Sequence, residues 1–145
     1  MRALVVDASV AIKWIIDEEG SPAALALRRH RLAAPDLWVA ECANILWKKV
    51  RRGELSGDEA VLAARLLARA EVELAPMRSY LEAATAIAVA LDHPAYDCVY
   101  LAMAEAAEMP FVTADERLLR KTRNVLGGRF AGLVLGLDEA ASLQD

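Results

Sequence analysis

The sequence predicts an α/β protein with a short, mainly parallel central sheet flanked by helices on both faces. Its candidate strands are short and largely apolar, which is typical of strands buried on both faces. They alternate with longer segments of helical character, the order expected of parallel strands joined by helices. The 145 residues, 57% of them hydrophobic, suit one domain spanning residues 1–145 with a sizeable core.

The first third of the chain begins with a strand and continues with helices. Apolar patterning predicts a strand over residues 2–6 and helices over 8–17, 22–31 and 37–52. Ser21 is expected to cap the second helix, with Pro22 at its first helical position. Gly53 is expected to end the third.

The remainder of the chain alternates in the same way. The pattern predicts helices over 56–71, 79–91, 96–107, 115–121 and 138–143, and strands over 72–74, 111–113 and 133–135. Asp7 and Asp115 each follow a predicted strand. Because ligands of parallel sheets bind beyond the carboxyl ends of the strands, both carboxylates are expected at that edge.

Charge and composition exclude several classes of protein. A net charge of −4 does not suit a protein that coats nucleic acid without specificity, although it leaves room for a local basic rim. Cys42 and Cys98 lack the spacing of a redox or metal motif and are predicted to be reduced core residues. Asp7 and Lys13 interrupt any secretory signal, and no apolar run is long enough to span a membrane. We therefore expect a soluble, cytoplasmic protein.

Four acidic residues lie within or beside apolar runs, where charge is costly. They are Asp7, Glu41, Asp97 and Asp115. A buried carboxylate is unfavourable unless it is paired, and no Lys or Arg lies at a spacing that would pair with them locally. If the fold gathers them, the natural counter-charge is a hard divalent cation.

Three of these residues also have a purely structural explanation. Asp7 and Asp97 could each cap the helix that follows, and Asp115 could be a first-turn acid favoured by the helix dipole. Capping and metal binding are compatible, because both place a carboxylate at a helix N-terminus. Local sequence therefore leaves both explanations open for these three.

Glu41 distinguishes the explanations because it lies in the middle of a predicted helix, where capping does not apply. Its neighbours at helical spacing are Leu37, Trp38, Asn44 and Ile45. Glu41 is thus predicted on or beside the buried face, and Asn44 adds a second polar group there. The alternative is a position at the edge of the core from which the side chain reaches water.

A shared site for all four carboxylates would require a cation. Two unit charges about 4 Å apart repel by about 4 kcal/mol at an effective dielectric near 20. Mg²⁺ and Mn²⁺ suit sites made only of oxygen ligands, and either can promote phosphoryl displacement by water. His30 and His93 are predicted to lie at the surface, so no histidine cluster suggests zinc.

Four segments, in order, carry a resemblance to a known family. They are residues 5–14 (VVDASVAIKW), 41–47 (ECANILW), 96–102 (YDCVYLA) and 113–119 (TADERLL). In these segments the chain resembles PIN-domain ribonucleases, and among them the VapC-type toxins of type II toxin–antitoxin systems. The resemblance runs from end to end and implies a PIN-like fold and an endoribonuclease that depends on Mg²⁺ or Mn²⁺.

The resemblance also implies roles for individual residues. Asp7 and Asp97 match the positions of direct metal ligands, whereas Glu41 would act through water and Asp115 would complete the site or hold a second ion. Ser9 and Thr113, together with Asn44, are expected to support the carboxylates. The implied partners are an RNA substrate, a cognate VapB-like antitoxin and a second copy of the chain in a homodimer.

Trp14, Trp38 and Trp47 mark helices that could form a groove for the antitoxin. The alternative is that these tryptophans belong to the core, which the sequence favours for Trp38 and Trp47.

Basic residues supply candidates for phosphate binding. Lys13 follows Asp7 by less than two turns, and three cations follow Asp115: Arg117, Arg120 and Lys121. The basic runs at 28–31 and 48–52 are predicted to be solvated helix faces.

Two rival functions remain to be weighed. One is a non-catalytic PIN module whose acidic pocket receives a basic peptide, and the intact carboxylates argue against it. The other is a phosphatase or phospho-acceptor, which is disfavoured because Ser9 stands where a second aspartate would be needed.

Overall fold

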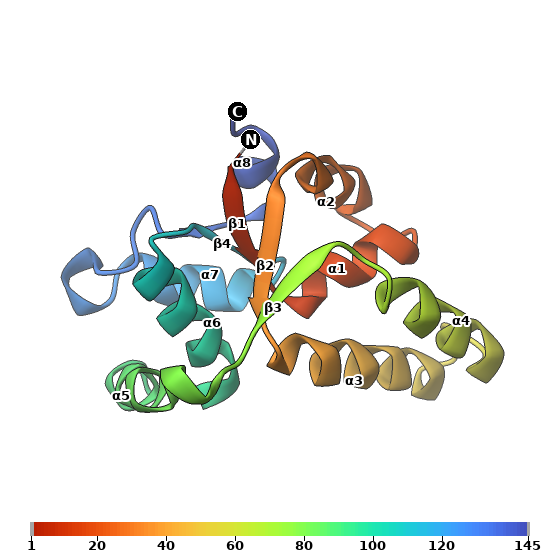
Figure 1. Ribbon diagram of the computed structural model, residues 1–145, viewed down its shortest axis with the longest axis horizontal. Coiled ribbons are helices and arrows are strands. Elements are labelled where there is room, and N and C mark those ends of the chain that lie inside the picture. Colours follow the sequence, from red (N-terminus) through yellow and green to blue (C-terminus); the bar gives the residue numbers. More distant parts are fainter. Residues whose placement is uncertain (1, 145) are drawn as a thin grey trace.

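The protein folds around a five-stranded sheet in which every pair of neighbouring strands is parallel (Figure 1). The computed structural model describes residues 2–144, so Met1 and Asp145 of the predicted domain lie outside the described residues. The strands are β1 Ala3–Val6, β2 Arg31–Pro35, β3 Val72–Ala75, β4 Phe111–Val112 and β5 Val134–Leu135. Their order across the sheet is β3-β2-β1-β4-β5.

Helices connect the strands along the whole of the described chain. They are α1 Ala8–Ile15, α2 Ser21–Ala26, α3 Leu37–Arg51, α4 Gly57–Leu67, α5 Leu81–Leu91, α6 Ala95–Ala107, α7 Glu116–Arg123 and α8 Leu137–Ala141. Short 3-10 turns, η1 Leu27–Arg29, η2 Arg78–Tyr80 and η3 Leu126–Gly128, complete the connections. None of the helices formed by residues 2–144 is long and apolar enough to cross a lipid bilayer.

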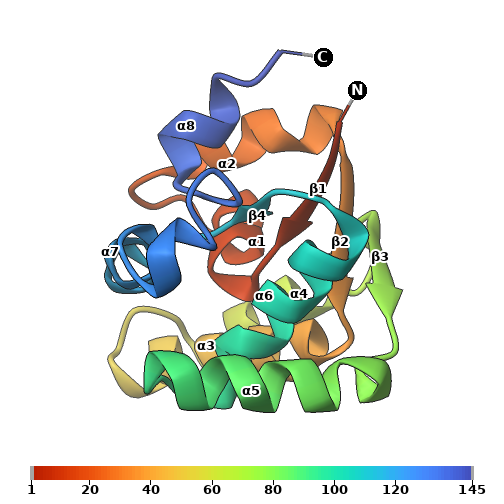
Figure 2. The same ribbon diagram turned by 90° about the vertical axis from the view of Figure 1, so that its left-hand side faces the viewer.

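Helices cover both faces of the sheet at its central strands, as their apolar residues predict, whereas Glu73 and Leu74 of the edge strand β3 are exposed. Helix α6 packs against β1, β2 and β4, with α5 on its outer side, while α1 and α2 lie on the other side of the sheet (Figures 1 and 2). Tyr100 of α6 stacks on Phe111 of β4 with ring centroids 5.3 Å apart. On the opposite side, the indole of Trp14 donates a hydrogen bond of 2.8 Å to the carbonyl of Ala24.

One predicted element was wrong. The segment over 22–31 was expected to be a continuous helix, but α2 ends at Ala26 and Arg31–Pro35 forms β2, between β1 and β3. The short, Ala-rich segment 31–35 has no periodicity that distinguishes a buried strand from a helix. It is a strand because it pairs with β1 on one side and β3 on the other.

The start of α2 also differs from the prediction. Gly20, at φ 88°, occupies the N-cap position, and Ser21 is the first helical residue. The hydroxyl of Ser21 instead accepts a hydrogen bond from the amide of Glu18 and donates one to the carbonyl of Ile16. Ser21 therefore closes the loop between α1 and α2 rather than capping the helix.

The strand order places the candidate site. The chain passes from β1 to β2 on one side and returns to β4 on the other, so β1 and β4 flank the point where the winding reverses. Crevices at such points, beyond the carboxyl ends of the strands, are where α/β sheets bind ligands. Asp7 follows β1 directly, and Asp115 lies three residues beyond the end of β4.

Candidate active site

The four acidic residues line one cavity of about 560 Å³ at the carboxyl edge of the sheet. They reach it from four different elements: Asp7 from the start of α1, Glu41 from the middle of α3, Asp97 from the first turn of α6 and Asp115 from the start of α7. Residues up to 108 positions apart in sequence thus meet only because the strands are parallel and their carboxyl ends coincide.

Asp7 is the most buried of the four, with 7% of its surface exposed. Its Oδ1 accepts hydrogen bonds from the hydroxyl of Ser9 at 2.5 Å and from the amide of Val10 at 3.3 Å. Its Oδ2 accepts one from the hydroxyl of Thr113 at 2.6 Å. Asp7 therefore caps α1, as its structural explanation requires, and its carboxylate is also fixed toward the cavity.

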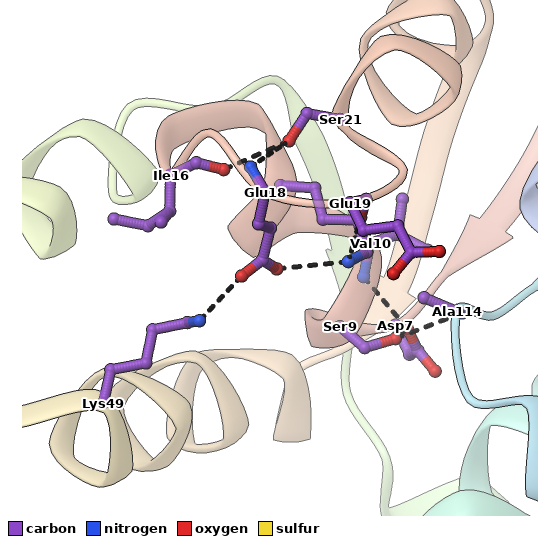
Figure 3. A network of polar contacts seen from close by, with 10 residues as sticks. Asp7, Ser9, Val10, Ile16, Glu18, Glu19, Ser21, Lys49 and Ala114 are labelled. Atoms are coloured by element: carbon purple, nitrogen blue, oxygen red, sulfur yellow. Dashed lines mark hydrogen bonds and ion pairs between the residues drawn. The ribbon is translucent and has the colours of Figure 1, made fainter. Parts of the chain in front are cut away.

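The two hydroxyls that hold Asp7 are themselves held by the segment after β4. Ser9 Oγ accepts a hydrogen bond from the amide of Ala114 at 3.2 Å (Figure 3), and Thr113 Oγ1 accepts one from the amide of Asp115 at 3.0 Å. Ser9 and Thr113 thus lie beside the Asp7 carboxylate and hydrogen-bond to it, the arrangement that the resemblance implies. The same contacts tie the end of β1 to the end of β4.

Burial raises the pKa of Asp7 from 3.8 to about 7. The hydrogen bonds from Ser9 and Thr113 oppose this rise, and the nearby charges of Asp97 and Glu41 add to it. Within residues 2–144, none of the four carboxylates forms an ion pair with a Lys or Arg. The buried carboxylate of Asp7 therefore has no basic side chain within residues 2–144 to offset its charge.

Glu41 lies at the boundary between the core and the cavity. The fully buried side of α3 carries Trp38, Cys42 and Leu46, and Glu41 beside them is half-buried. Burial raises its pKa, the hydroxyl of Tyr100 nearby lowers it, and the charge of Asp97 raises it. Glu41 therefore lies beside the buried face of α3, and its side chain lines the cavity.

Asp97 does not cap its helix, so the structural explanation that the sequence left open for it does not apply. Pro94 occupies the N-cap position of α6, and Asp97 lies in the first turn. Its Oδ2 instead lies 2.6 Å from Nε2 of His93.

Both histidines were wrongly predicted at the surface. The side chain of His93 is 11% exposed, and His30 is buried, where its Nδ1 accepts a hydrogen bond from the amide of Arg2.

Asp115 is the exposed member of the group. Its Oδ1 caps α7 by accepting hydrogen bonds from the amides of Arg117 at 3.0 Å and Leu118 at 3.2 Å. It lines the same cavity from an exposed position, and its amide is connected to the buried Asp7 through the hydroxyl of Thr113.

This geometry agrees with comparisons with known proteins. A model of the PIN domain matches residues 4–124, which is most of the chain. The chain belongs to the PIN-domain family.

Two relatives give this assignment more detail. The chain is 37% identical over 123 residues to "Ribonuclease VapC3" of Pyrobaculum aerophilum, covering 81% of this chain and 93% of that protein. The crystal structure of PAE2754, also from Pyrobaculum aerophilum, superposes with a TM-score of 0.71 over 97% of this chain and 93% of that one. At 22% identity the second likeness shows the fold alone.

The acidic cavity of this PIN domain has further lining residues. Asn44, predicted as a supporting group, lines it from an exposed position one turn from Glu41. Lys48 and Tyr96 also line it, and neither was predicted as a site residue. Lys48 could have been found from its spacing, because seven residues from Glu41 is two helical turns on the same face.

The predicted phosphate-binding residues do not line the acidic cavity. The ammonium of Lys13 pairs with Glu18 at 3.1 Å. The ammonium of Lys121 donates to the carbonyl of Asp92 at 2.7 Å. Arg117 and Arg120 are exposed on α7. Among the residues that line the cavity, Lys48 is the one cation.

The donor set fits a hard divalent cation. Every acidic group at the cavity offers carboxylate oxygen, the donor preferred by Mg²⁺ and Mn²⁺, and Asp7 lacks the counter-charge that its burial demands. In the described part of the chain, no three His, Cys, Asp or Glu side chains already converge closely enough to hold a metal ion.

Proposed function

We propose that this PIN domain is a metal-dependent endoribonuclease that hydrolyses RNA phosphodiester bonds in the cytoplasm. The observation that carries the proposal is the meeting of four carboxylates in one cavity, where no Lys or Arg of residues 2–144 forms an ion pair with them. The name of its relative, a ribonuclease 37% identical to this chain, supports the same activity.

In this proposal Asp7 and Asp97 bind Mg²⁺ or Mn²⁺ directly, Glu41 acts through water, and Asp115 completes the site or holds a second ion. Bound metal would neutralise charge on the phosphate and promote ionisation of the attacking water. Ser9 and Thr113 keep both oxygens of Asp7 oriented through their hydrogen bonds.

Glu41 and Lys48 would complete the chemistry. The carboxylate of Glu41, with its pKa raised by burial, is suited to accept a proton from the attacking water. Lys48, at the same cavity, offers a positive charge to the backbone of the RNA strand beside the attacked phosphate. Asn44 supplies an amide that can orient water beside Glu41.

We further propose that the chain is the toxin of a toxin–antitoxin pair, inhibited by a VapB-like antitoxin and active as a homodimer. The relative named VapC3 supports this, as do exposed apolar side chains on α3 and α4. They are Val39, Trp47, Val61, Leu62 and Leu66. Trp14 and Trp38 are buried, so of the three tryptophans only Trp47, predicted to be core, is available to a partner.

The direct test is cleavage of RNA by the wild-type chain and by Asp7→Asn and Asp97→Asn, with Mg²⁺, Mn²⁺ or EDTA. The proposal expects activity only in the wild type with metal, and Asp17→Asn, an exposed acid outside the cavity, serves as the matched control. Full activity in EDTA, or in both site variants, would contradict it. A folded, inactive wild type that still binds a basic peptide would favour the non-catalytic alternative.

A further inference from the structure

A second cavity, of about 340 Å³, adjoins the acidic cavity and has the opposite charge. The two cavities share Ser9, Ile45, Lys48 and Asp115 among their lining residues. Four cations line the second cavity, which we call the basic groove: Lys13, Lys48, Lys49 and Arg52. Its carboxylates are Glu18 and Asp115, so its net charge is positive although the whole chain carries −4.

One face of α3 connects the two cavities. Residues 41, 45, 48 and 52 are spaced by four, three and four positions, so they form one stripe along the helix. At 1.5 Å of rise per residue, Lys48 lies about 10 Å and Arg52 about 16 Å beyond Glu41 along the helix axis. The stripe changes from acidic to basic over this distance. Arg51 lies off it, with its guanidinium 5.2 Å from the centre of the Trp47 ring.

Glu18 holds two of the four cations in place. Its carboxylate pairs with Lys49 of α3 at 2.7 Å (Figure 3). It also pairs with Lys13 at 3.1 Å, and so joins the end of α1 to α3. Lys13 also donates to the carbonyl of Glu19 at 2.7 Å. By contrast, the exposed side chains of Lys48 and Arg52 have no hydrogen-bond or ion-pair partner within residues 2–144, so their charge is available to a ligand.

This arrangement addresses a difficulty with an acidic nuclease site. A metal can neutralise the phosphate at the cleaved bond, but the flanking phosphates would still meet a negative cavity. Cations placed about two to three helical turns away provide sequence-independent contacts for those flanking phosphates. A polyanionic strand leaving the acidic cavity along α3 would reach Lys48 first and Arg52 next.

We propose that the basic groove binds the phosphates of single-stranded RNA that flank the bond cleaved in the acidic cavity. Lys48 and Arg52 make the contacts, and Lys13 and Lys49, braced by Glu18, provide the positive field behind them. The inference rests on the proposed ribonuclease function and names the path of its substrate. It transfers the role of phosphate binding from Arg117, Arg120 and Lys121 on α7 to α3.

The test measures binding of a fluorescein-labelled oligouridylate by anisotropy across a range of salt concentrations. The parent protein carries Asp7→Asn, so the strand is not cleaved, and Mg²⁺ is present throughout. The variants add Lys48→Ala, Arg52→Ala or both, and Arg51→Ala is the control that removes the same charge from the neighbouring face. Circular dichroism and thermal unfolding establish that each variant folds.

Each lost contact should weaken binding roughly fivefold at 0.1 M salt and reduce the slope of log K against log salt by about 0.7. Arg51→Ala should change both much less. The inference would be overturned if Arg51→Ala weakened binding as much as the double variant does. It would also be overturned if the wild type cleaved RNA but the parent protein did not bind the oligouridylate at low salt. Equally tight binding of an oligoglutamate would also overturn it, in favour of an acidic peptide ligand.

The same experiment separates the inference from the function on which it rests. If the wild type cleaves RNA but the double variant keeps its affinity and salt slope, the ribonuclease function stands and the basic groove does not. If the double variant loses binding but no RNA is cleaved with Mg²⁺ or Mn²⁺, the groove stands and the catalytic proposal fails.

Discussion

The imidazole Nε2 of His93 lies 2.6 Å from Oδ2 of Asp97, so the break before α6 is bonded to the first turn of that helix. His93 is therefore hydrogen-bonded to one oxygen of a carboxylate that lines the acidic cavity. Contacts of this kind fix the orientation of metal-binding carboxylates and tune their affinity for the ion.

We predict that His93→Ala weakens Mn²⁺ binding by about 10- to 100-fold, because the Asp97 carboxylate loses the donor that orients it. His93→Gln, which can still donate a hydrogen bond, should recover part of the affinity. Electron paramagnetic resonance of free Mn²⁺ measures the Mn²⁺ affinity of both variants without reference to activity. An affinity that is unchanged in His93→Ala, or that His93→Gln fails to recover, would assign the pair a purely structural role.

The metal-free protein should lose stability as pH rises from about 4 to about 7. Burial raises the pKa of Asp7 from 3.8 to about 7, so over this range the folded state holds a proton that the unfolded state has released. Asp7 thus contributes most to the free energy of unfolding at pH values below its pKa in the unfolded state. This contribution falls by up to about 4 kcal/mol as the pH rises past its pKa in the folded state. Asp7→Asn should remove this loss, leaving a more stable metal-free protein at pH 7.5.

Urea unfolding in EDTA at several pH values, compared between the wild type and Asp7→Asn, measures this difference. Asp17→Asn is again the control, because Asp17 is exposed and does not line the cavity. This variant should show the same dependence of the free energy of unfolding on pH as the wild type. Parallel curves for the wild type and Asp7→Asn would show that Asp7 titrates normally. Mg²⁺ should stabilise the wild type and not Asp7→Asn, because the ion replaces the proton on this carboxylate.

Thr113→Val should shift the acidic limb of the pH profile of RNA cleavage to higher pH. The hydroxyl of Thr113 donates to Oδ2 of Asp7 and lowers its pKa, opposing the effect of burial. A hydrogen bond to a charged group contributes about 1.5–3 kcal/mol, so its loss should move the limb by about one to two pH units. Thr113→Ser keeps the donor and should behave as the wild type. A profile that falls in amplitude but does not move would contradict the prediction.

Much of the acidic site could be predicted because its signals are local. Asp7 and Asp115 follow apolar strands, and parallel strands end at a common edge. Glu41 has a mid-helix position that no cap explains, and its neighbours at helical spacing placed it beside the core. Asp97 was singled out by the apolar run that follows it, but only the resemblance grouped it with the other acids, because its helix joins the site through packing of α6 on the sheet.

The features that were missed depend on tertiary contacts. β2 is a strand because β1 and β3 pair with its two edges, which a short run of Leu and Ala does not reveal. His93 looked like part of a surface turn because Pro94 separates it from the helix whose carboxylate it binds. The run 48–52 was interpreted as one solvated face, yet it carries Lys48 and Arg52 on the cavity side and Arg51 on another.

Glu18→Gln should change stability and RNA binding in opposite directions. Hydrogen bonds from Lys49 and Lys13 outweigh partial burial and hold the pKa of Glu18 below its ordinary value. Its ion pairs therefore stabilise the fold above the unfolded pKa, and this contribution is lost as pH falls through the folded pKa. Because the groups are partly exposed, their loss at pH 7 should cost about 1 kcal/mol, or roughly 3 °C in Tm.

The same substitution removes a negative charge from the basic groove, so oligouridylate should bind more tightly at low salt, with the gain disappearing as salt is raised. Glu19→Gln is the matched control, because Glu19 contacts Lys13 through its backbone carbonyl and no ion pair joins its carboxylate to residues 2–144. Thermal unfolding and anisotropy on the two variants measure both effects. Weaker binding by Glu18→Gln would show that the two lysines must be held in place to act, and that their charge alone is insufficient.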